Sequence, residues 1–185
     1  MTNTRKMAIV AALSALSFLL MFYQIPLVAE FLKLDFSIIP ILLALVLLDF
    51  KSSVAVLLIR SVLKLALNGH GVETLIGLPI NIVAILVFVL FFALFWEKKR
   101  DLMSYLLASF LGILSLTASM LALNAFYAIP LYARFANFDI GQIIGVSKYL
   151  LTMIVPFNLL EGMIWAVAFW LIYTLLTPVL KRYEK

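Results

Sequence analysis

The sequence predicts an all-α membrane protein, a six-transmembrane-helix bundle with long extracellular loops 1 and 5 and with both termini in the cytoplasm. Of its 185 residues, 66% are hydrophobic and only 12% are charged, whereas soluble domains usually carry roughly 25% charged residues. The apolar residues form runs that suit a hydrocarbon core of ~30 Å, which a helix of about 20 residues crosses. Lys and Arg lie beside the ends of these runs, as anchors on the cytoplasmic side do.

The predicted spans use most of the chain and leave room only for loops and short tails. We therefore expect residues 1–185 to form a single transmembrane domain. The first apolar run follows a short basic flank, as in a signal peptide, but no cleavage site followed by a soluble chain is present, so we interpret it as a membrane helix. The sequence contains no cysteine, which excludes disulfides and thiolate catalysis.

The first half of the chain predicts one full span and two short ones. Residues 6–24 form the first span, which Pro26 ends. Residues 25–40 mix charged, proline and apolar residues, and this loop is too hydrophobic to lie freely in water. We expect it to fold back over the bundle. Residues 38–48 and 53–67 are apolar but short for full spans.

The second half predicts three further spans. Residues 75–96 and 102–126 form the fourth and fifth helices, and residues 148–176 form the sixth. Between the last two, residues 127–145 contain a proline, two glycines and charged groups, which predicts a second long extracellular loop. Pro156 should kink the last helix or mark its true start.

The distribution of positive charge predicts the orientation. We attribute the formal net charge of +5 to anchoring on the cytoplasmic side rather than to binding of nucleic acid, because most of the cations flank apolar runs. Placing both termini in the cytoplasm puts these Lys and Arg residues on that side: Arg5, Lys6, Lys51, Lys98, Lys99, Arg100, Lys181, Arg182 and Lys185.

Polar side chains inside the apolar spans are the candidates for function. Such groups are costly in a membrane, although hydrogen bonding between helices is an alternative role. Asparagine offers both a donor and an acceptor, which suits the mixed polar edge of a neutral heterocycle. We expect ligand contacts from Asn124 and Asn158, whereas for Asn81 a structural hydrogen bond is equally expected.

Three charged residues also fall within the predicted spans. Arg60 and Lys64 lie one helical turn apart, and near an outer helix end both side chains can extend to the interface. Glu161 must be paired, protonated or hydrated, and Lys64, Arg60 and Lys148 are possible partners. A proton-coupled carrier would use such a pair, so this alternative stays open.

No pattern in the sequence indicates an enzyme or a metal centre. It contains no nucleophile with a paired base, no GxxxxGK[ST] phosphate loop and no HExxH zinc motif. The lone His70 is interpreted as an ordinary surface residue. If the protein's function requires ATP, another subunit must bind it.

Small residues gather in the first predicted helix at helical spacing. Ala8, Ala11, Ala12 and Ala15 permit close approach by another helix. Internal packing would explain this stripe, and docking of an external partner is the alternative.

Three segments carry a resemblance to a known family: LKLDFSIIP (residues 32–40), LNAFYAIPLY (123–132) and VPFNLLEGM (155–163). Together they resemble the riboflavin-specific S component of energy-coupling factor (ECF) transporters, and the likeness covers nearly the whole chain. It implies a plasma-membrane subunit that binds riboflavin without a cofactor, a metal or a covalent step. It also implies two kinds of partner, a transmembrane coupling subunit and two cytoplasmic ATPases.

The resemblance also implies a set of site residues. In the capping loop and around the flavin these are Leu34, Asp35, Phe36, Lys64, Asn81, Asn124, Tyr132, Asn158 and Glu161. The alanine face of the first helix is similar to the family's docking surface for the coupling subunit. Glu161 stands where the family often has lysine, and Lys64 where it often has asparagine. A swapped charge pair would preserve the pocket, or the change indicates a related vitamin.

Overall fold

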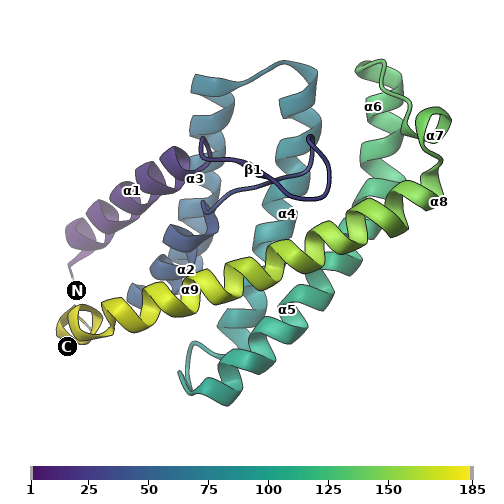
Figure 1. Ribbon diagram of the computed structural model, residues 1–185. Helices are drawn as coiled ribbons and strands as arrows, with labels where there is room; N and C mark the ends of the chain where they lie inside the picture. The colour runs from purple at the N-terminus through teal and green to yellow at the C-terminus, as the bar shows by residue number, and fades with distance from the viewer. Residues whose placement is uncertain (1, 184–185) are drawn as a thin grey trace.

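The computed structural model describes residues 2–183, and side chains as far as residue 178, and it is almost entirely helical (Figure 1). Lys185 and the side chains of Lys181 and Arg182, which we predicted as anchors, lie outside the described part. Four helical stretches in the described part are long and apolar enough to cross a membrane: Asn3–Leu20, Val72–Phe95, Leu102–Phe135 and Val146–Pro178.

The first helix leads into a short antiparallel ribbon. Helix α1 (Asn3–Leu20) is followed by strands β1 (Ile25–Pro26) and β2 (Lys33–Leu34), in which Ile25 lies opposite Leu34. The connection from α1 through this ribbon crosses the bundle (Figure 1). We call residues 25–37 the capping segment.

The next two helices form a short hairpin. Helix α2 (Ile38–Leu47) is buried over most of its length, and its ten residues span only about 15 Å, half a hydrocarbon core. The side chain of Asp49 caps helix α3 (Phe50–Asn68) by accepting from the backbone N–H of Ser52 at 2.8 Å. The predicted break between the two apolar runs is therefore confirmed, and counting α2 and α3 among six spans stays a prediction.

Helices α4 (Val72–Phe95) and α5 (Leu102–Leu123) pack against each other and against the last helix. Gly162 of that helix permits the close approach to α5, because a Cβ atom there would lie 2.8 Å from Cγ1 of Ile113. Aromatic side chains fill the core between these helices, mostly in edge-to-face contact: Phe88, Phe92, Trp96, Tyr105, Trp165 and Phe169.

The chain after α5 differs from the predicted loop. A π-helical turn, η1 (Asn124–Ala128), continues directly into α6 (Ile129–Phe135), so the prediction of an irregular loop over residues 127–145 is wrong as far as Phe135. A proline normally breaks an α-helix by removing a hydrogen bond and clashing with the carbonyl four residues earlier. The wider π turn just before Pro130 relieves that clash.

A second π-helical turn lies just before the last helix. Helices α7 (Ile140–Ile143) and α8 (Val146–Tyr149) lead into a second π turn, η2 (Leu150–Ile154), and then into α9 (Val155–Tyr183). Pro156 lies in the first turn of α9, but the helical path runs unbroken from α8, so Pro156 does not mark the start of the last membrane helix.

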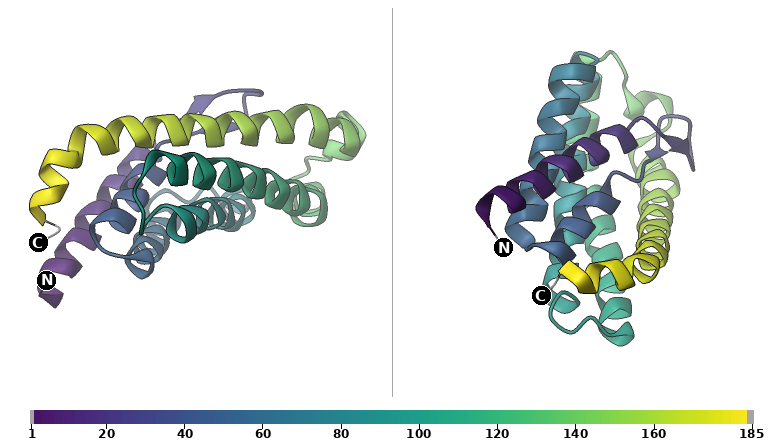
Figure 2. Two further views of the ribbon diagram at one scale, coloured as in Figure 1. Left: turned by 90° about the horizontal axis from the view of Figure 1, so that it is seen from below. Right: turned by 90° about the vertical axis from the view of Figure 1, so that its left-hand side faces the viewer.

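Both termini lie toward the same end of the bundle, near the turn between α4 and α5 (Figures 1 and 2). Two contacts tie this end together: Lys6 donates to Asp49, and Nη2 of Arg100 donates to the carbonyl of Val46 at 2.9 Å. We call it the basic end, because it collects Arg5, Lys6, Lys51, Lys98, Lys99 and Arg100. Helices α6, α7 and α8 lie away from it (Figure 1).

Candidate ligand-binding site

Hydrogen bonds from two helices hold the capping segment in place. The indole N–H of Trp165 donates to the carbonyl of Asp35 at 2.9 Å, and the hydroxyl of Ser17 donates to the carbonyl of Ser37 at 2.5 Å. Within the segment, the backbone N–H of Ser37 donates to Oδ1 of Asp35 at 2.8 Å. Helices α9 and α1 thus anchor the end of the capping segment to the bundle.

The structure places the three predicted capping residues at this anchored end. Leu34 is 1% exposed and belongs to the core, while its neighbour Lys33 is exposed, as alternation along a strand requires. Asp35 is buried and Phe36 is half-buried. Their side chains therefore lie between the capping segment and the helices below it.

Arg60 links the capping segment to α4. Its side chain is 0% exposed; Nη1 donates to the hydroxyl of Ser37 at 2.6 Å and Nη2 donates to Oδ1 of Asn81 at 2.5 Å. Its Nε–H has no acceptor among the described residues. The expectation that Arg60 extends to the membrane interface is wrong, because its partners lie inside the bundle.

Lys64, one turn further along α3, behaves differently. Its ammonium donates to Oδ1 of Asn68 at 2.5 Å and lies 5.6 Å from the ring centroid of Phe22. Asn68 is the last residue of α3, so the lysine side chain points along the helix toward that end. Extension of Lys64 to the membrane interface stays a prediction.

Glu161 bonds to none of the partners that were possible for it. It is 7% exposed, yet its carboxylate accepts no hydrogen bond and forms no ion pair with any described residue, and Lys148 is exposed on α8. The charge that acts on it is Asp35, which is also acidic. Of the three alternatives for Glu161, pairing with Lys64, Arg60 or Lys148 is absent from the described part of the chain, and protonation or hydration stays open.

Asp35 is the common neighbour in a cluster of four charges. It interacts electrostatically with Arg60, Lys64 and Glu161. Between residues 2 and 183, no three His, Cys, Asp or Glu side chains are close enough to share a metal ion.

Asn158 presents a second open acceptor on α9. Its side-chain amide donates to the carbonyl of Ile154 at 2.7 Å and it is 3% exposed, while its Oδ1 accepts nothing from the residues that the structure describes. Asn158 and Glu161 are three residues apart and share a helix face. Because Oδ1 of Asn158 and the carboxylate of Glu161 accept no hydrogen bond from described residues, this face of α9 suits a ligand that donates hydrogen bonds.

Asn124 lies in the first π turn and bonds to Tyr149. Its amide donates to the carbonyl of Met120 at 2.9 Å, and the hydroxyl of Tyr149 donates to its Oδ1 at 3.2 Å. Tyr132 is half-buried, and its hydroxyl lies against Gly77, 3.6 Å from where a Cβ atom would stand. Asn124 and Tyr132 thus line the region between the π turns and α4, which pack together.

The capping segment also reaches this second region. The ring of Phe31 lies 6.2 Å from that of Phe138 and 6.3 Å from that of Tyr149, measured between centroids. No hydrogen bond joins Asn81, Asn124 and Asn158 to one another in the described chain. Of the three asparagines, Asn81 bonds to Arg60 and Asn124 bonds to Tyr149, and the capping segment contacts both Arg60 and Tyr149.

Sequence reasoning missed three residues that build this arrangement. Ser37, Tyr149 and Trp165 were not among the candidates, although each holds a predicted residue in place. Serine and the aromatic residues are common in membrane helices, so nothing in the sequence pattern distinguishes these three.

The alanine stripe of α1 faces away from the bundle. Ala8, Ala11, Ala12 and Ala15 are all exposed, whereas Ser14 and Ser17 form the buried side of the helix. Internal packing therefore does not account for the stripe. Its use as a docking surface stays a prediction.

The fold and the site define a multi-pass helical membrane protein whose buried polar side chains collect beneath a capping segment. Residues 5–173 match the model of the family "ECF transporter, substrate-specific component". The chain belongs to this family, the substrate-specific components of ECF transporters.

Individual relatives agree with this assignment. The chain is 57% identical to the riboflavin transporter RibU of Streptococcus thermophilus, over 98% of this chain and 87% of the relative. It is 40% identical to RibU of Leuconostoc mesenteroides, over 99% and 96%. A solved S component of a bacterial ECF transporter superposes with a TM-score of 0.79 at 27% identity, over 97% of this chain and 99% of that one.

Family membership confirms two predictions. The chain is a transport component rather than an enzyme, and it is a multi-pass protein of the plasma membrane.

Proposed function

We propose that this chain is the riboflavin-binding S component of an ATP-driven ECF importer. Both relatives described above are riboflavin transporters, and they cover nearly the whole chain. The single observation that carries the proposal within the structure is the pair of open acceptors on α9, at Asn158 and Glu161, beneath the capping segment.

Riboflavin has the chemistry that such a site requires. Its ring system is flat and apolar on both faces, and its polar edge carries one imide N–H between two carbonyls. Glu161 or Asn158 would accept from the imide N–H or from ribityl hydroxyls. Phe36 and Tyr132 would supply apolar contact for the ring.

The full set of proposed contacts follows from the resemblance and keeps every predicted residue: Leu34, Asp35, Phe36, Lys64, Asn81, Asn124, Tyr132, Asn158 and Glu161. The structure changes the proposed role of two of them. Lys64 is oriented toward the end of α3, so it would contact the flavin only after releasing Asn68. Asn81 already accepts from Arg60, so its amide N–H would face the ligand.

The proposed orientation places the basic end in the cytoplasm and the capping segment outside. Helices α2 and α3 then complete six membrane segments, and riboflavin enters from the extracellular side. The exposed face formed by Ala8, Ala11, Ala12 and Ala15 would dock a transmembrane coupling subunit. Two cytoplasmic ATPases would drive the cycle, in which the loaded S component tilts in the membrane.

Reconstitution tests this function directly. Proteoliposomes that contain the chain with the coupling subunit and ATPases should take up riboflavin on addition of ATP, and those with the chain alone should not. Uptake by the chain alone, driven by a proton gradient, would instead establish the proton-coupled carrier. Glu161, a buried carboxylate without a protein partner, is the observation that favours this second candidate.

A further inference from the structure

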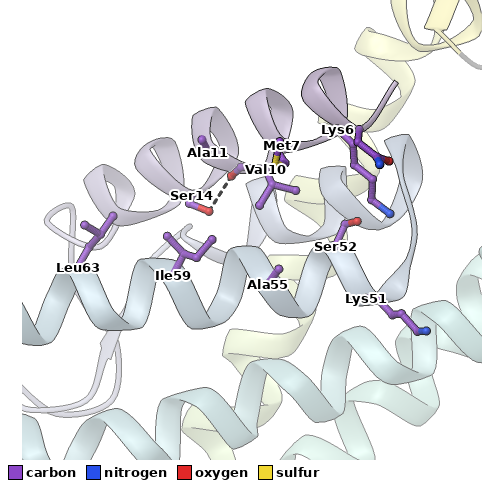
Figure 3. A pocket seen from close by; sticks show the side chains of 11 residues that line it. Lys6, Met7, Val10, Ala11, Ser14, Lys51, Ser52, Ala55, Ile59 and Leu63 are labelled. Atoms are coloured by element: carbon purple, nitrogen blue, oxygen red, sulfur yellow. Dashed lines mark hydrogen bonds between the residues drawn. The ribbon is translucent and has the colours of Figure 1, made fainter. Parts of the chain in front are cut away.

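A groove of about 860 Å³ opens between α1 and α3 (Figure 3). Arg60, which bonds to the capping segment and to Asn81 of α4, does not line it. Lys6 and Lys51 lie at one end of it, and Leu63 lies at the other (Figure 3). None of the proposed riboflavin contacts lines the groove.

The walls of the groove suit a hydrocarbon chain. Val10 comes from α1, and Ala55, Ile59 and Leu63 come from α3. The hydroxyl of Ser14 also lies on the wall, but it donates to the carbonyl of Val10 at 2.7 Å in its own helix (Figure 3). A hydrocarbon chain against this wall would therefore leave that hydroxyl satisfied.

The length of the groove corresponds to one membrane leaflet. Lys51 and Leu63 are twelve residues apart on α3, which at 1.5 Å per residue is about 18 Å. The hydrocarbon core is ~30 Å thick, so the groove runs from the basic end to just beyond the middle of the membrane. A partner helix that crosses the membrane would need a groove of nearly twice this length.

The charged end of the groove can receive an anion. Lys6 bonds to Asp49 but its side chain remains 41% exposed. Lys51 is exposed and forms no ion pair with another described residue. With Lys6 and Asp49 balancing each other, Lys51 leaves this end with one uncompensated positive charge.

We propose that the groove binds an anionic phospholipid of the cytoplasmic leaflet, with its phosphate between Lys6 and Lys51 and one acyl chain along Val10, Ala55 and Ile59. The proposal rests on the orientation given above and not on the identity of the transported vitamin. Of the alanine stripe, Ala11 lines the groove and Ala8, Ala12 and Ala15 do not, so the lipid and a partner on the alanine face would occupy neighbouring surfaces of α1 that meet at Ala11.

Native mass spectrometry of the purified chain tests this site. The protein is incubated with equal amounts of phosphatidylglycerol and phosphatidylcholine of identical acyl chains, and the retained lipid is counted. We expect preferential retention of phosphatidylglycerol, and we expect Lys51→Gln to reduce it about fivefold, the usual effect of one cation near an anionic lipid. Lys98→Gln, which removes an exposed lysine at the same end but outside the groove, is the matched control and should retain the wild-type preference.

Ala55→Phe provides a second test, because it fills the apolar part of the groove and should lower retention of both lipids. Riboflavin binding should be unchanged in both groove variants, which shows that they are folded. Equal retention of the two lipids by the wild type would overturn the proposal, as would an equal loss in Lys51→Gln and Lys98→Gln. Normal lipid retention in Lys51→Gln with failed assembly on the coupling subunit would make the groove a protein interface instead.

Discussion

The guanidinium of Arg60 donates to Oδ1 of Asn81 at 2.5 Å and so joins α3 to α4 inside the membrane. The same side chain holds Ser37 at the end of the capping segment. A residue proposed to contact the flavin and the segment proposed to cover it are therefore fixed by one buried group. Arg60 is best described as a positioning residue for both.

Replacing Arg60 should destabilise the capping segment more than it alters the ligand contacts. Arg60→Met leaves the hydroxyl of Ser37 and Oδ1 of Asn81 without their donor, at a cost of about 1–3 kcal/mol for each buried group. We expect a lower melting temperature and faster dissociation of riboflavin, measured by stopped-flow recovery of flavin fluorescence. Lys64→Met, one turn away on α3, should leave the melting temperature nearly unchanged. Equal melting temperatures for Arg60→Met and wild type would contradict this role.

Asn158→Ala should weaken riboflavin binding by about 1–3 kcal/mol, because a buried hydrogen bond to the ligand is lost. A fluorescence titration of the purified variant measures the change. Thr152→Ala is the matched control: Thr152 is exposed four residues before Pro156 and bonds only to the carbonyl of Lys148 in its own helix. If Asn158→Ala and Thr152→Ala bind equally well, Asn158 is not part of the site.

Glu161→Gln separates flavin binding from proton coupling. The amide keeps an acceptor for a donor on the flavin but cannot carry a proton through the cycle. We expect ATP-driven uptake by the reconstituted transporter to persist, with binding weakened severalfold because a hydrogen bond to a charged group is stronger than one to a neutral group. Complete loss of uptake with intact riboflavin binding would favour the carrier mechanism.

The ion pair at the basic end predicts a pH dependence of stability. Burial raises the pKa of Asp49, but hydrogen bonds from Lys6 and Ser52 outweigh it, so that the pKa lies below its usual value of 3.8. A carboxyl whose pKa is lower in the folded state stabilises the fold above pH 3.8, and this stabilisation is lost as the pH falls through the folded pKa.

Asp49→Asn should remove this part of the pH dependence. Because the pair is about 40% exposed, we expect its loss to cost less than about 1 kcal/mol at pH 7. Melting temperatures at pH 7 and pH 3 measure the effect: the difference between the wild type and the variant should be smaller at pH 3 than at pH 7. A constant difference across that range would show that the carboxylate's charge is not responsible.

The long helices were predictable because hydrophobic length alone defines them. The predicted span 75–96 corresponds to Val72–Phe95, and the span that we began at residue 102 corresponds to the start of α5. The helical path through Pro130 was not predictable from composition, since it depends on a π turn that a proline rule does not consider.

The candidate site was predictable in residue type but not in pairing. Asn124, Asn158 and Glu161 were chosen because they are polar residues in apolar spans, and the structure shows that all three are buried. The partner of Arg60 was not predictable, because Ser37 and Asn81 are 23 and 21 residues away and meet it only when three elements pack together. Helical spacing relates neighbours one turn apart, so it cannot reveal such contacts.

Titration of the purified chain with riboflavin, followed by quenching of flavin fluorescence, tests the central claim most directly. We predict saturable binding of one riboflavin per chain without ATP or partner subunits, weakened in Asn158→Ala and unchanged in Thr152→Ala. An absence of saturable quenching by a folded, monodisperse preparation would contradict the proposal that these polar groups beneath the capping segment bind riboflavin.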